Sequence, residues 1–311
     1  KRNMRVMVML GNPPYNVSSS NKGKWIEDLM LTYKADLNEK NIKPLSDDYI
    51  KFIRYAQYQI EEQTGEGIVA FITNNSFLDG VIHRQMRREL LRVFDEIYIL
   101  NLHGNSRMKE KAPDGGKDEN VFDIQAGVSI NIFVKHKETK HEQAKLSYHE
   151  LYGQRQEKFD ALSRLNLCST SWKELQPVEP YYFFTQKDFS QTKAYSNGFL
   201  LTELFENFGV GTVTGRDRLL VHYTVSAAQE FVEAVKLMRP ETFRQIYNPG
   251  RDSRDWQVAN MLQDIKAESL ALIRYTYRPY DERFIPYSAH YKGVFSASCY
   301  PTLGALLHSC N

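Results

Sequence analysis

The residues best suited to chemistry form the tetrapeptide Asn12-Pro13-Pro14-Tyr15, which directly follows an apolar run. An amino group on an aromatic ring is a poor nucleophile, because its lone pair is delocalised into the ring. The side-chain oxygen of Asn12 and the carbonyl oxygen of Pro13 can both accept hydrogen bonds from such a group and favour a pyramidal nitrogen. Proline restricts φ and so holds the backbone in place, and Tyr15 offers a flat ring on which an extruded base can stack. The tetrapeptide therefore predicts a loop that prepares the amino group of a base for reaction.

The elements around this loop predict where it lies. The run Arg5 to Leu10 (RVMVML) ends at Gly11 and predicts a buried parallel strand. Two consecutive prolines exclude both helix and ladder pairing, so we expect a loop at the end of this strand. Open α/β sheets bind ligands beyond the carboxyl ends of their strands. The predicted strand thus places Asn12 where a site is expected.

Alternating helical and strand patterns follow the loop. Asp47 and Asp48 are candidate caps for a helix whose apolar positions run at helical spacing to Ile60. The next patterns are typical of a strand over Ile68–Thr73, a helix over Arg84–Phe94 and a strand over Ile97–Leu102. This alternation predicts a parallel, doubly wound sheet. A charged outer face is the interpretation for four arginines of the second helix, Arg84, Arg87, Arg88 and Arg92.

The segment from Gly104 to Asn120 has almost no apolar side chains and predicts a mobile surface loop. Its lysines are nearly cancelled by acidic neighbours, which favours a solvated loop over DNA contacts. After it, the patterns predict strands over Val128–Val134 and Ala144–Tyr148. The polar turn His136 to Glu142 lies between these strands and predicts a hairpin at the edge of the sheet.

The length of 311 residues is typical of two domains. We expect an α/β unit over residues 1–150, a linker over 151–194 and a second unit over 195–311. Two helices are predicted in the second unit, one that is capped by Ser226 and runs to Met238 and one from Trp256 to Lys266. The glycine-rich turn before them, residues 209–215, lacks the strand, the helix and the Lys-Ser/Thr ending of a phosphate-binding loop.

The composition narrows the class of protein. Hydrophobic residues make up 42% of the chain and charged residues 25%, as in ordinary globular proteins. A net charge of +2 is not the strong basic bias that by itself indicates nucleic-acid binding. Three cysteines have neither metal-ligand spacing nor the even count of a disulfide framework, so we expect a reducing cytoplasm and no metal site. No apolar run approaches the ~20 residues of a membrane helix.

Several segments resemble a known family. GNPPYN after a strand, followed by GIVAFITNNSFL and VFDIQAGVSINIFVK, resembles the fold of adenine-specific DNA methyltransferases whose recognition domain lies C-terminal. More narrowly, FENFGVGTVTGRDRLLV and YTYRPYDERFIPY are similar to the methyltransferase and target-recognition part of single-polypeptide restriction-modification enzymes that also carry a nuclease and a helicase. The resemblance covers nearly the whole chain.

This resemblance implies a fold and partners. Residues 1–150 would be the C-terminal half of a doubly wound, Rossmann-like methyltransferase domain, and residues 195–311 part of an α+β target-recognition domain. The implied activity is transfer of a methyl group to N6 of an adenine flipped out of double-stranded DNA. The implied partners are double-stranded DNA and the upstream nuclease, helicase and cofactor-binding segments of the same polypeptide, in the cytoplasm of a bacterium.

The resemblance also assigns residues. Asn12 and the Pro13 carbonyl would hold the target amino group, and Tyr15 would stack on the flipped base. Phe122, in the loop before the late edge strand, would close the other side of the base, although an ordinary core aromatic explains it equally. The family binds S-adenosylmethionine through a glycine-rich turn and an acidic residue upstream of the tetrapeptide. Residues 1–11 contain neither, so we expect S-adenosylmethionine in the full-length protein and little or no binding to this chain.

Three arginines of the second unit are candidates for DNA contacts. Arg216 and Arg218 follow the glycine-rich turn and could reach phosphates or base edges, although a solvated turn explains them equally. Arg278 lies in a segment, Arg274 to Tyr280, that alternates basic and aromatic residues. Such alternation can track a nucleic-acid backbone, but it is also typical of a half-buried strand.

Two other functions remain open from the residues. A protein glutamine methyltransferase faces the same delocalised nitrogen and also uses Asn-Pro-Pro-Tyr, but such chains end soon after the sheet. A module that only recognises DNA for an attached nuclease or helicase would have no use for the uncharged loop at Asn12. The long C-terminal part with its aromatic and basic segments favours a DNA methyltransferase over both.

Overall fold

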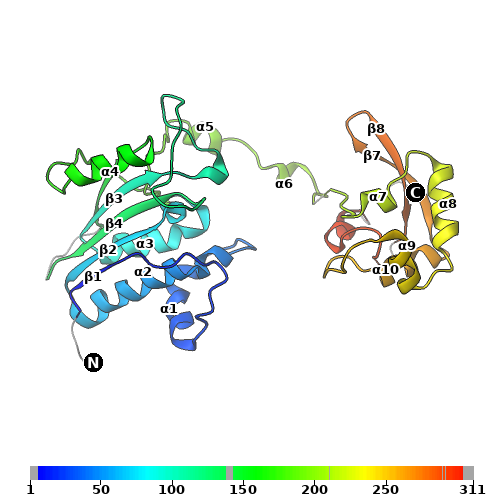
Figure 1. Ribbon diagram of the computed structural model, residues 1–311, viewed down its shortest axis with the longest axis horizontal. Helices are drawn as coiled ribbons and strands as arrows, with labels where there is room; N and C mark the ends of the chain where they lie inside the picture. Colours follow the sequence, from blue (N-terminus) through cyan, green and yellow to red (C-terminus); the bar gives the residue numbers. More distant parts are fainter. Residues whose placement is uncertain (1–5, 138–142, 210, 289, 291, 304–311) are drawn as a thin grey trace. The chain divides into compact units, whose positions relative to one another are not determined.

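A computed structural model gives the structure of the protein and describes residues 6–137, 143–209, 211–288, 290 and 292–303. The chain divides into two compact units, Lys1–Phe189 and Ser190–Asn311, and each is described by itself (Figure 1). None of the helices in the described ranges is long and apolar enough to cross a membrane.

The first unit is built on a six-stranded sheet with the strand order β1-β2-β4-β3-β5-β6. The strands are β1 (Val8–Gly11), β2 (Gly67–Asn74), β3 (Glu96–His103), β4 (Val128–Lys135), β5 (Lys145–Glu150) and β6 (Lys173–Leu175). β1 runs parallel to β2, and β3 runs parallel to β5. β4 is antiparallel to both of its neighbours, and β6 is antiparallel to β5. The α/β class is confirmed, but the expected parallel sheet with a hairpin only at its edge is wrong, because the antiparallel strand β4 lies in the middle of a mixed sheet.

The hairpin expected between β4 and β5 does not form. β4 instead lies between β2 and β3, where Ile130 is opposite Ile72 on one side and Leu100 on the other. In this central position both edges of β4 are hydrogen-bonded, and Val128 and Phe133 are buried. A strand pattern shows which face is apolar but not which strand is the partner. Residues 138–142 of the predicted turn lie outside the described residues, as does Arg5 at the start of the first predicted strand.

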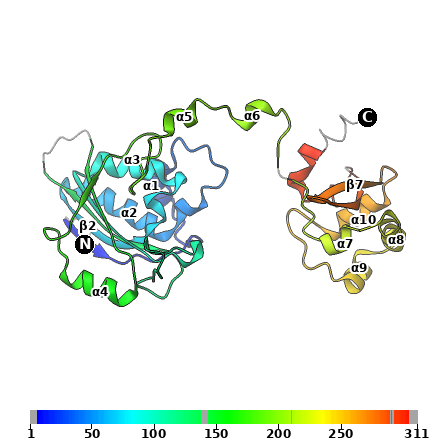
Figure 2. The ribbon, with the colours of Figure 1, turned by 90° about the horizontal axis from the view of Figure 1, so that it is seen from above.

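Helices cover both faces of the sheet. Those of the first unit are α1 (Lys24–Lys34), α2 (Asp48–Tyr58), α3 (Arg84–Val93) and α4 (Arg155–Arg164). Figure 2 shows α1, α2 and α3 on one side of the sheet and α4 on the other. α2 and α3 confirm the two predicted helices. α1 was not predicted, although its buried residues Ile26, Met30 and Tyr33 repeat at helical spacing.

Short turns of other helical types connect these elements. They are a π turn at Gln59–Thr64 and 3₁₀ turns at Lys43–Ser46, Asn75–Leu78, Val81–His83, Ser106–Met108 and, in the second unit, Ala297–Cys299. Within 151–194, where a linker was expected, α4 and β6 instead form part of the first unit, which extends to Phe189.

One arginine of α3 contradicts the interpretation of a charged outer face. The side chain of Arg87 is fully buried, whereas Arg88 and Arg92 are exposed. The Arg87 guanidinium donates to the carbonyl oxygens of Phe77, Gly80, Tyr181 and Tyr182 at 2.5–3.0 Å. Burial is the main reason that its pKa is lowered to about 9. Arg87 therefore ties segment 181–182 to α3, and helical periodicity alone could not separate it from its exposed neighbours.

The second unit combines helices with one two-stranded sheet. Its elements are α5 (Thr192–Ser196), α6 (Leu201–Leu204), α7 (Asp217–Leu220), α8 (Val225–Val235), α9 (Pro240–Tyr247), α10 (Val258–Lys266), β7 (Ala271–Arg278) and β8 (Asp281–Tyr287). Its core includes Phe243, Met261 and Phe295. The helix predicted with Ser226 as its cap is confirmed as α8, but its cap is Thr224, whose side chain accepts from the Ala227 amide at 3.2 Å, and it ends at Val235 rather than Met238.

Candidate functional site

The Asn12-Pro13-Pro14-Tyr15 loop directly follows β1, as expected for a site at the carboxyl end of a strand. Asn12 is exposed, Pro13 is buried and Tyr15 is partly buried. The Tyr15 hydroxyl donates to the side-chain oxygen of Asn12 at 3.0 Å, and the Ile72 carbonyl at the end of β2 lies 3.4 Å from the same hydroxyl. The tyrosine thus folds back over the loop and orients the asparagine amide.

The beginning of α2 holds this loop. The Asn16 amide donates to the carboxylate of Asp47 at 2.7 Å, and the Asp48 amide donates back to the Asn16 carbonyl at 3.3 Å. Tyr49 meets the Tyr15 ring edge to face, with ring centroids 6.0 Å apart. Burial, together with the charge of Asp47, raises the pKa of Tyr15 to about 12. The Tyr15 hydroxyl is therefore a stable hydrogen-bond donor at neutral pH.

The geometry leaves an acceptor at Asn12. An amide oxygen can accept two hydrogen bonds, and the Tyr15 hydroxyl is the one donor to this oxygen within the described residues. The second acceptor position can receive an N–H group from a bound molecule. The loop can therefore accept hydrogen bonds from an amino group beside a flat aromatic ring, but it offers no charged side chain of its own.

Phe122 lies in the loop that precedes β4. It packs against an apolar cluster of Leu100, Leu102, Val121 and Val128, and Tyr15 packs against the same cluster. The structure thus brings Phe122 and Tyr15, which are far apart in the sequence, to one group of side chains. Phe122 is only partly buried.

Side chains from two elements hold the backbone at Phe122. The Phe122 amide donates to the side-chain oxygen of Asn120 at 2.9 Å, and the Asn120 amide group donates to the Gly104 and Ala126 carbonyls. Arg155, at the start of α4, donates to the carbonyls of Asn120 at 2.7 Å and Phe122 at 3.0 Å. The segment expected to be mobile, Gly104 to Asn120, is therefore held at both of its ends.

A buried ion pair lies beneath the same loop. Lys158 of α4 and Asp118 are both inaccessible to solvent, and Nζ lies 2.7 Å from the carboxylate oxygen. Lys158 also donates to the carbonyls of Leu102 and Glu119 at 2.7 Å each. Asp118 accepts from the amides of Gly104 at 2.6 Å and Gly153 at 2.9 Å. The sequence interpretation of a solvated, charge-cancelling loop is wrong for Asp118, because no local pattern shows that a distant lysine meets it.

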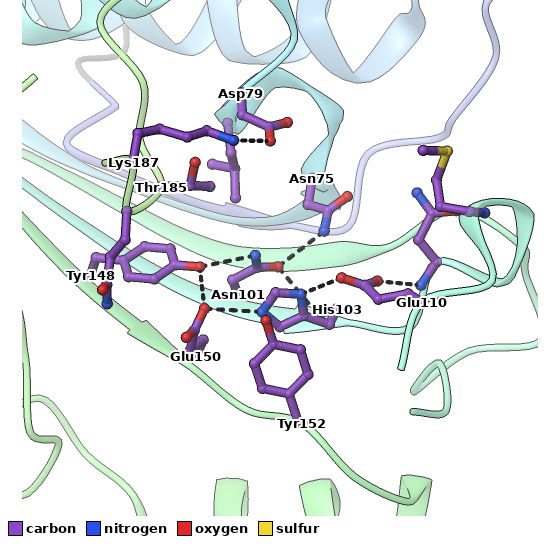
Figure 3. Close-up of a pocket in the computed structure, with 14 residues that line it drawn as sticks. Asn75, Asp79, Asn101, His103, Glu110, Tyr148, Glu150, Tyr152, Thr185 and Lys187 are labelled. Atoms are coloured by element: carbon purple, nitrogen blue, oxygen red, sulfur yellow. Dashed lines mark hydrogen bonds and ion pairs between the residues drawn. The ribbon is translucent and has the colours of Figure 1, made fainter. Parts of the chain in front are cut away.

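A polar pocket of about 550 Å³ lies at the carboxyl ends of β2, β3 and β5. Figure 3 shows the ring of His103 between the carboxylates of Glu110 and Glu150. Nδ1 lies 2.7 Å from Glu110, Nε2 lies 3.2 Å from Glu150, and the ring stacks on Tyr152 at 3.8 Å. Asn101 and Tyr148 extend the network, with the Tyr148 hydroxyl donating to Glu150 at 2.7 Å.

This pocket was not predicted. Burial alone would lower the pKa of His103, but its hydrogen bonds to Glu110 and Glu150 and their charges outweigh burial and raise it. The His103 bond is the main reason that the pKa of Glu150 is lowered. A histidine with a carboxylate at each ring nitrogen is held as an imidazolium. The polar groups thus bind one another, and none of Asn12 to Tyr15 lines the pocket. Within the described residues, no group of His, Cys, Asp and Glu side chains is arranged to hold a metal.

The three arginines proposed for DNA contacts have different surroundings. Arg216 donates to the carbonyls of Gly215 at 2.7 Å and Arg251 at 3.0 Å, and its guanidinium lies over Trp256. It is therefore tied into the second unit. Arg218 is exposed, and exposed Arg278 lies over the ring of Tyr277.

Two family comparisons match separate parts of the chain. Residues 1–107 match the Eco57I restriction-modification methylase family. Residues 203–303 match the Type ISP C-terminal specificity domain. No curated protein matches the chain.

Solved structures with a similar fold include three complexes with DNA or a DNA mimic. The chain shares 22% identity with the ATP-dependent Type ISP restriction-modification enzyme LlaBIII bound to DNA, at a TM-score of 0.65. The match covers 96% of this chain and 21% of LlaBIII. The DrdV–DNA complex shares 24% identity at a TM-score of 0.60, and the match covers 91% of this chain and 30% of DrdV. A nuclease-deletion mutant of the Type ISP restriction-modification enzyme LlaGI, in complex with a DNA substrate mimic, shares 20% identity at a TM-score of 0.59. That match covers 90% of this chain and 30% of LlaGI. The chain therefore spans less than a third of the length of each.

The order of the two matched parts defines a methylase segment joined to a specificity domain, as in restriction-modification enzymes. More narrowly, the two parts of the chain are similar to the methylase and the specificity domain of Type ISP restriction-modification enzymes. The match to a specificity domain does not favour a protein glutamine methyltransferase. The match to a methylase family does not favour a module that only recognises DNA.

Proposed function

We propose that this chain supplies the target-adenine half of a site-specific DNA methyltransferase that methylates N6 of an adenine. The observation that carries the proposal is the Asn12 amide, exposed and oriented by Tyr15 at the carboxyl end of β1, within a segment that matches a restriction-modification methylase family. That loop offers hydrogen-bond acceptors beside an aromatic ring, which suits an adenine amino group.

Each residue of the loop has a role in the proposal. An adenine flipped out of the duplex donates its amino hydrogens to Asn12 and to the Pro13 carbonyl, and these bonds favour a pyramidal nitrogen. Pro14 restricts the backbone between them and Tyr15. Tyr15 stacks on one face of the base, and Phe122 covers the other. The shared packing of Tyr15 and Phe122 on one apolar cluster supports this pairing.

S-adenosylmethionine is the methyl donor that the proposal implies for the full-length enzyme, but the described residues do not fit it. Gly11 is followed by Asn12 and Pro13 rather than by further glycines, and no glycine-rich turn leads from a strand into a helix within the described ranges. We propose that other segments of the full-length polypeptide hold the cofactor. Isothermal titration of this chain tests this point, and tight binding would contradict it.

The open edge of the sheet supports a larger domain. β1 is the outermost strand, and its residues Val8 and Leu10 are 54% and 74% exposed. An apolar edge strand invites pairing with another strand. We propose that the sheet continues past β1 in the complete enzyme, as in a doubly wound, Rossmann-like methyltransferase.

The second unit is proposed to recognise double-stranded DNA. Arg218 and Arg278 are exposed and free to reach phosphates or base edges, whereas Arg216 supports the turn beside them. The proposed partners are the DNA and the nuclease and helicase segments of the same polypeptide. The proposed location is the cytoplasm of a bacterium, where the DNA lies.

A methylation assay on the full-length protein tests the function. With labelled S-adenosylmethionine and adenine-containing duplex, Asn12→Ala should abolish methyl transfer and leave DNA binding largely intact. Asn16→Ala is the matched control, because Asn16 is an exposed asparagine of the same loop whose side chain accepts from the Ser18 amide. Retained methyl transfer in Asn12→Ala would overturn the assignment.

A further inference from the structure

A fully exposed tyrosine lies at the tip of the only two-stranded sheet of the described second unit. Pro279 and Tyr280 form the turn between β7 and β8, and the paired residues Arg278 and Asp281 flank it. Tyr280 is the most exposed of the large hydrophobic side chains described, with a relative exposure of 106%. Its ring therefore has no contact that stabilises the unit.

The backbone at Tyr280 is also unfavourable for this residue. Its φ is +65°, in the left-handed region that glycine and asparagine adopt readily and bulky residues rarely do. Two-residue hairpin turns favour asparagine, aspartate or glycine at such positions for this reason. An exposed aromatic ring on a strained backbone does nothing for folding, and strain of this kind is found at sites where function requires it.

The base of the hairpin is held firmly, which leaves only the tip free. Arg283 lies between the rings of Tyr223 and Tyr277, 4.2 Å from each ring centroid. The Tyr277 hydroxyl donates to Asp217 of α7 at 2.8 Å, and His222 pairs with Phe284 of β8 through two backbone hydrogen bonds. The hairpin is thus a rigid support for Tyr280.

Cationic side chains lie beside the tip. Arg274, Thr276 and Arg278 are the exposed residues that alternate along β7 toward the turn. The Arg274 guanidinium forms an ion pair at 3.2 Å with the carboxylate of Glu282 on the neighbouring strand, and both side chains are more than half exposed. Arg278 stacks on Tyr277 and has its guanidinium open to solvent. A ring at the tip with arginines along one edge matches a base stack bordered by phosphates.

We propose that the β7–β8 hairpin enters a groove of duplex DNA and that the Tyr280 ring stacks on a base there, while Arg278 contacts the phosphate backbone. The major groove, about 12 Å wide, admits a two-stranded ribbon, and every base presents a flat face on which an aromatic ring can stack. The proposal rests on the proposed function of the second unit as a DNA-recognition domain, and it adds the residue that makes the stacking contact.

The test uses the full-length protein and a short duplex that contains the sequence it methylates. Fluorescence anisotropy gives the Kd, and thermal unfolding gives the Tm. Tyr280→Asn keeps a residue that tolerates the left-handed backbone and removes the ring, so we expect a Kd weakened about 5-fold or more with an unchanged or higher Tm. Tyr280→Phe keeps the ring and should bind like the parent protein.

A matched control is Leu237→Asn, because Leu237 is the other large apolar side chain of the second unit that is more than 90% exposed. This variant should leave Kd unchanged. Parent-like binding by Tyr280→Asn would overturn the proposal, as would equal weakening by Tyr280→Phe. These outcomes differ from failure of the proposed function, in which the parent protein itself methylates no adenine or Asn12→Ala keeps full activity.

Discussion

The Tyr15 hydroxyl donates a hydrogen bond to the side-chain oxygen of Asn12 across 3.0 Å. In this arrangement the oxygen of the amide, rather than its nitrogen, faces the tyrosine hydroxyl. The raised pKa of Tyr15 keeps its hydroxyl protonated at neutral pH. In the proposed reaction the tyrosine therefore has two parts with separate roles, a ring that stacks on the base and a hydroxyl that orients Asn12.

Tyr15→Phe separates the two roles. The ring remains, but the amide of Asn12 is free to rotate, so we expect kcat for methylation to fall about 2- to 10-fold, the value of one net hydrogen bond, with KM for DNA nearly unchanged. Tyr15→Ala should lose more, because stacking is lost as well. Steady-state kinetics of the full-length protein give both constants, and an unchanged kcat in Tyr15→Phe would show that the hydroxyl is not needed.

Arg155 is expected to act on the base through Phe122. Arg155→Ala removes the bonds to the Asn120 and Phe122 carbonyls and should reduce kcat/KM several-fold. If Arg155 positions Phe122, the loss from Arg155→Ala should disappear in a Phe122→Ala background, because contacting residues are not additive. Arg164→Ala, at the other end of α4, is the control, since its guanidinium contacts only its own helix at Asp160. Additive losses would contradict the positioning role.

The buried pair of Lys158 and Asp118 predicts a large effect on stability. Lys158→Met leaves a buried carboxylate without its partner, and the free energy of unfolding should fall by about 3–5 kcal/mol. Adding Asp118→Asn should recover much of that loss, because the unpaired charge is removed. Lys117→Met is the control, since Lys117 is 78% exposed and its pair with Glu119 is at the surface. Urea denaturation measures all three, and a loss no larger than that of Lys117→Met would contradict the prediction.

The His103 network predicts a pH dependence of stability. The pKa of His103 is raised above its ordinary 6.5, so its contribution is complete below 6.5 and is lost as the pH rises through the folded-state pKa. The pKa of Glu150 is lowered below its ordinary 4.5, so its contribution is complete above 4.5 and is lost as the pH falls through its folded-state pKa. The network should therefore stabilise most between about pH 4.5 and 6.5.

His103→Gln tests this dependence. The difference in unfolding free energy between the parent protein and this variant should be largest in that window and should shrink on both the alkaline and the acidic side. His136→Gln is the control, because the His136 side chain is half exposed and its ring contacts the Glu96 carboxylate at the surface. Denaturation midpoints across the pH range measure the difference, and a flat profile for His103→Gln would rule out the imidazolium network.

Elements with a strong local pattern were predictable. Two prolines after an apolar run require a loop at a strand end, and the apolar spacing of α2 and α3 gave both helices to within a few residues. The predicted strands over 68–73 and 97–102 correspond to β2 and β3. α1 was missed even though its buried residues repeat at helical spacing, because its cap is Gly23, which has no side chain to cap the helix.

What the sequence by itself determined is the loop at Asn12, its place after a strand and the alternation of helices and strands, since these depend on steric limits and spacing within a few residues. The tertiary structure alone decided the insertion of β4 between β2 and β3, the burial of Arg87 and the pairing of Lys158 with Asp118. Each of these depends on partners far away in the chain. A local pattern shows whether a side chain is polar, whereas burial and pairing are set by the free energy of the whole packed unit.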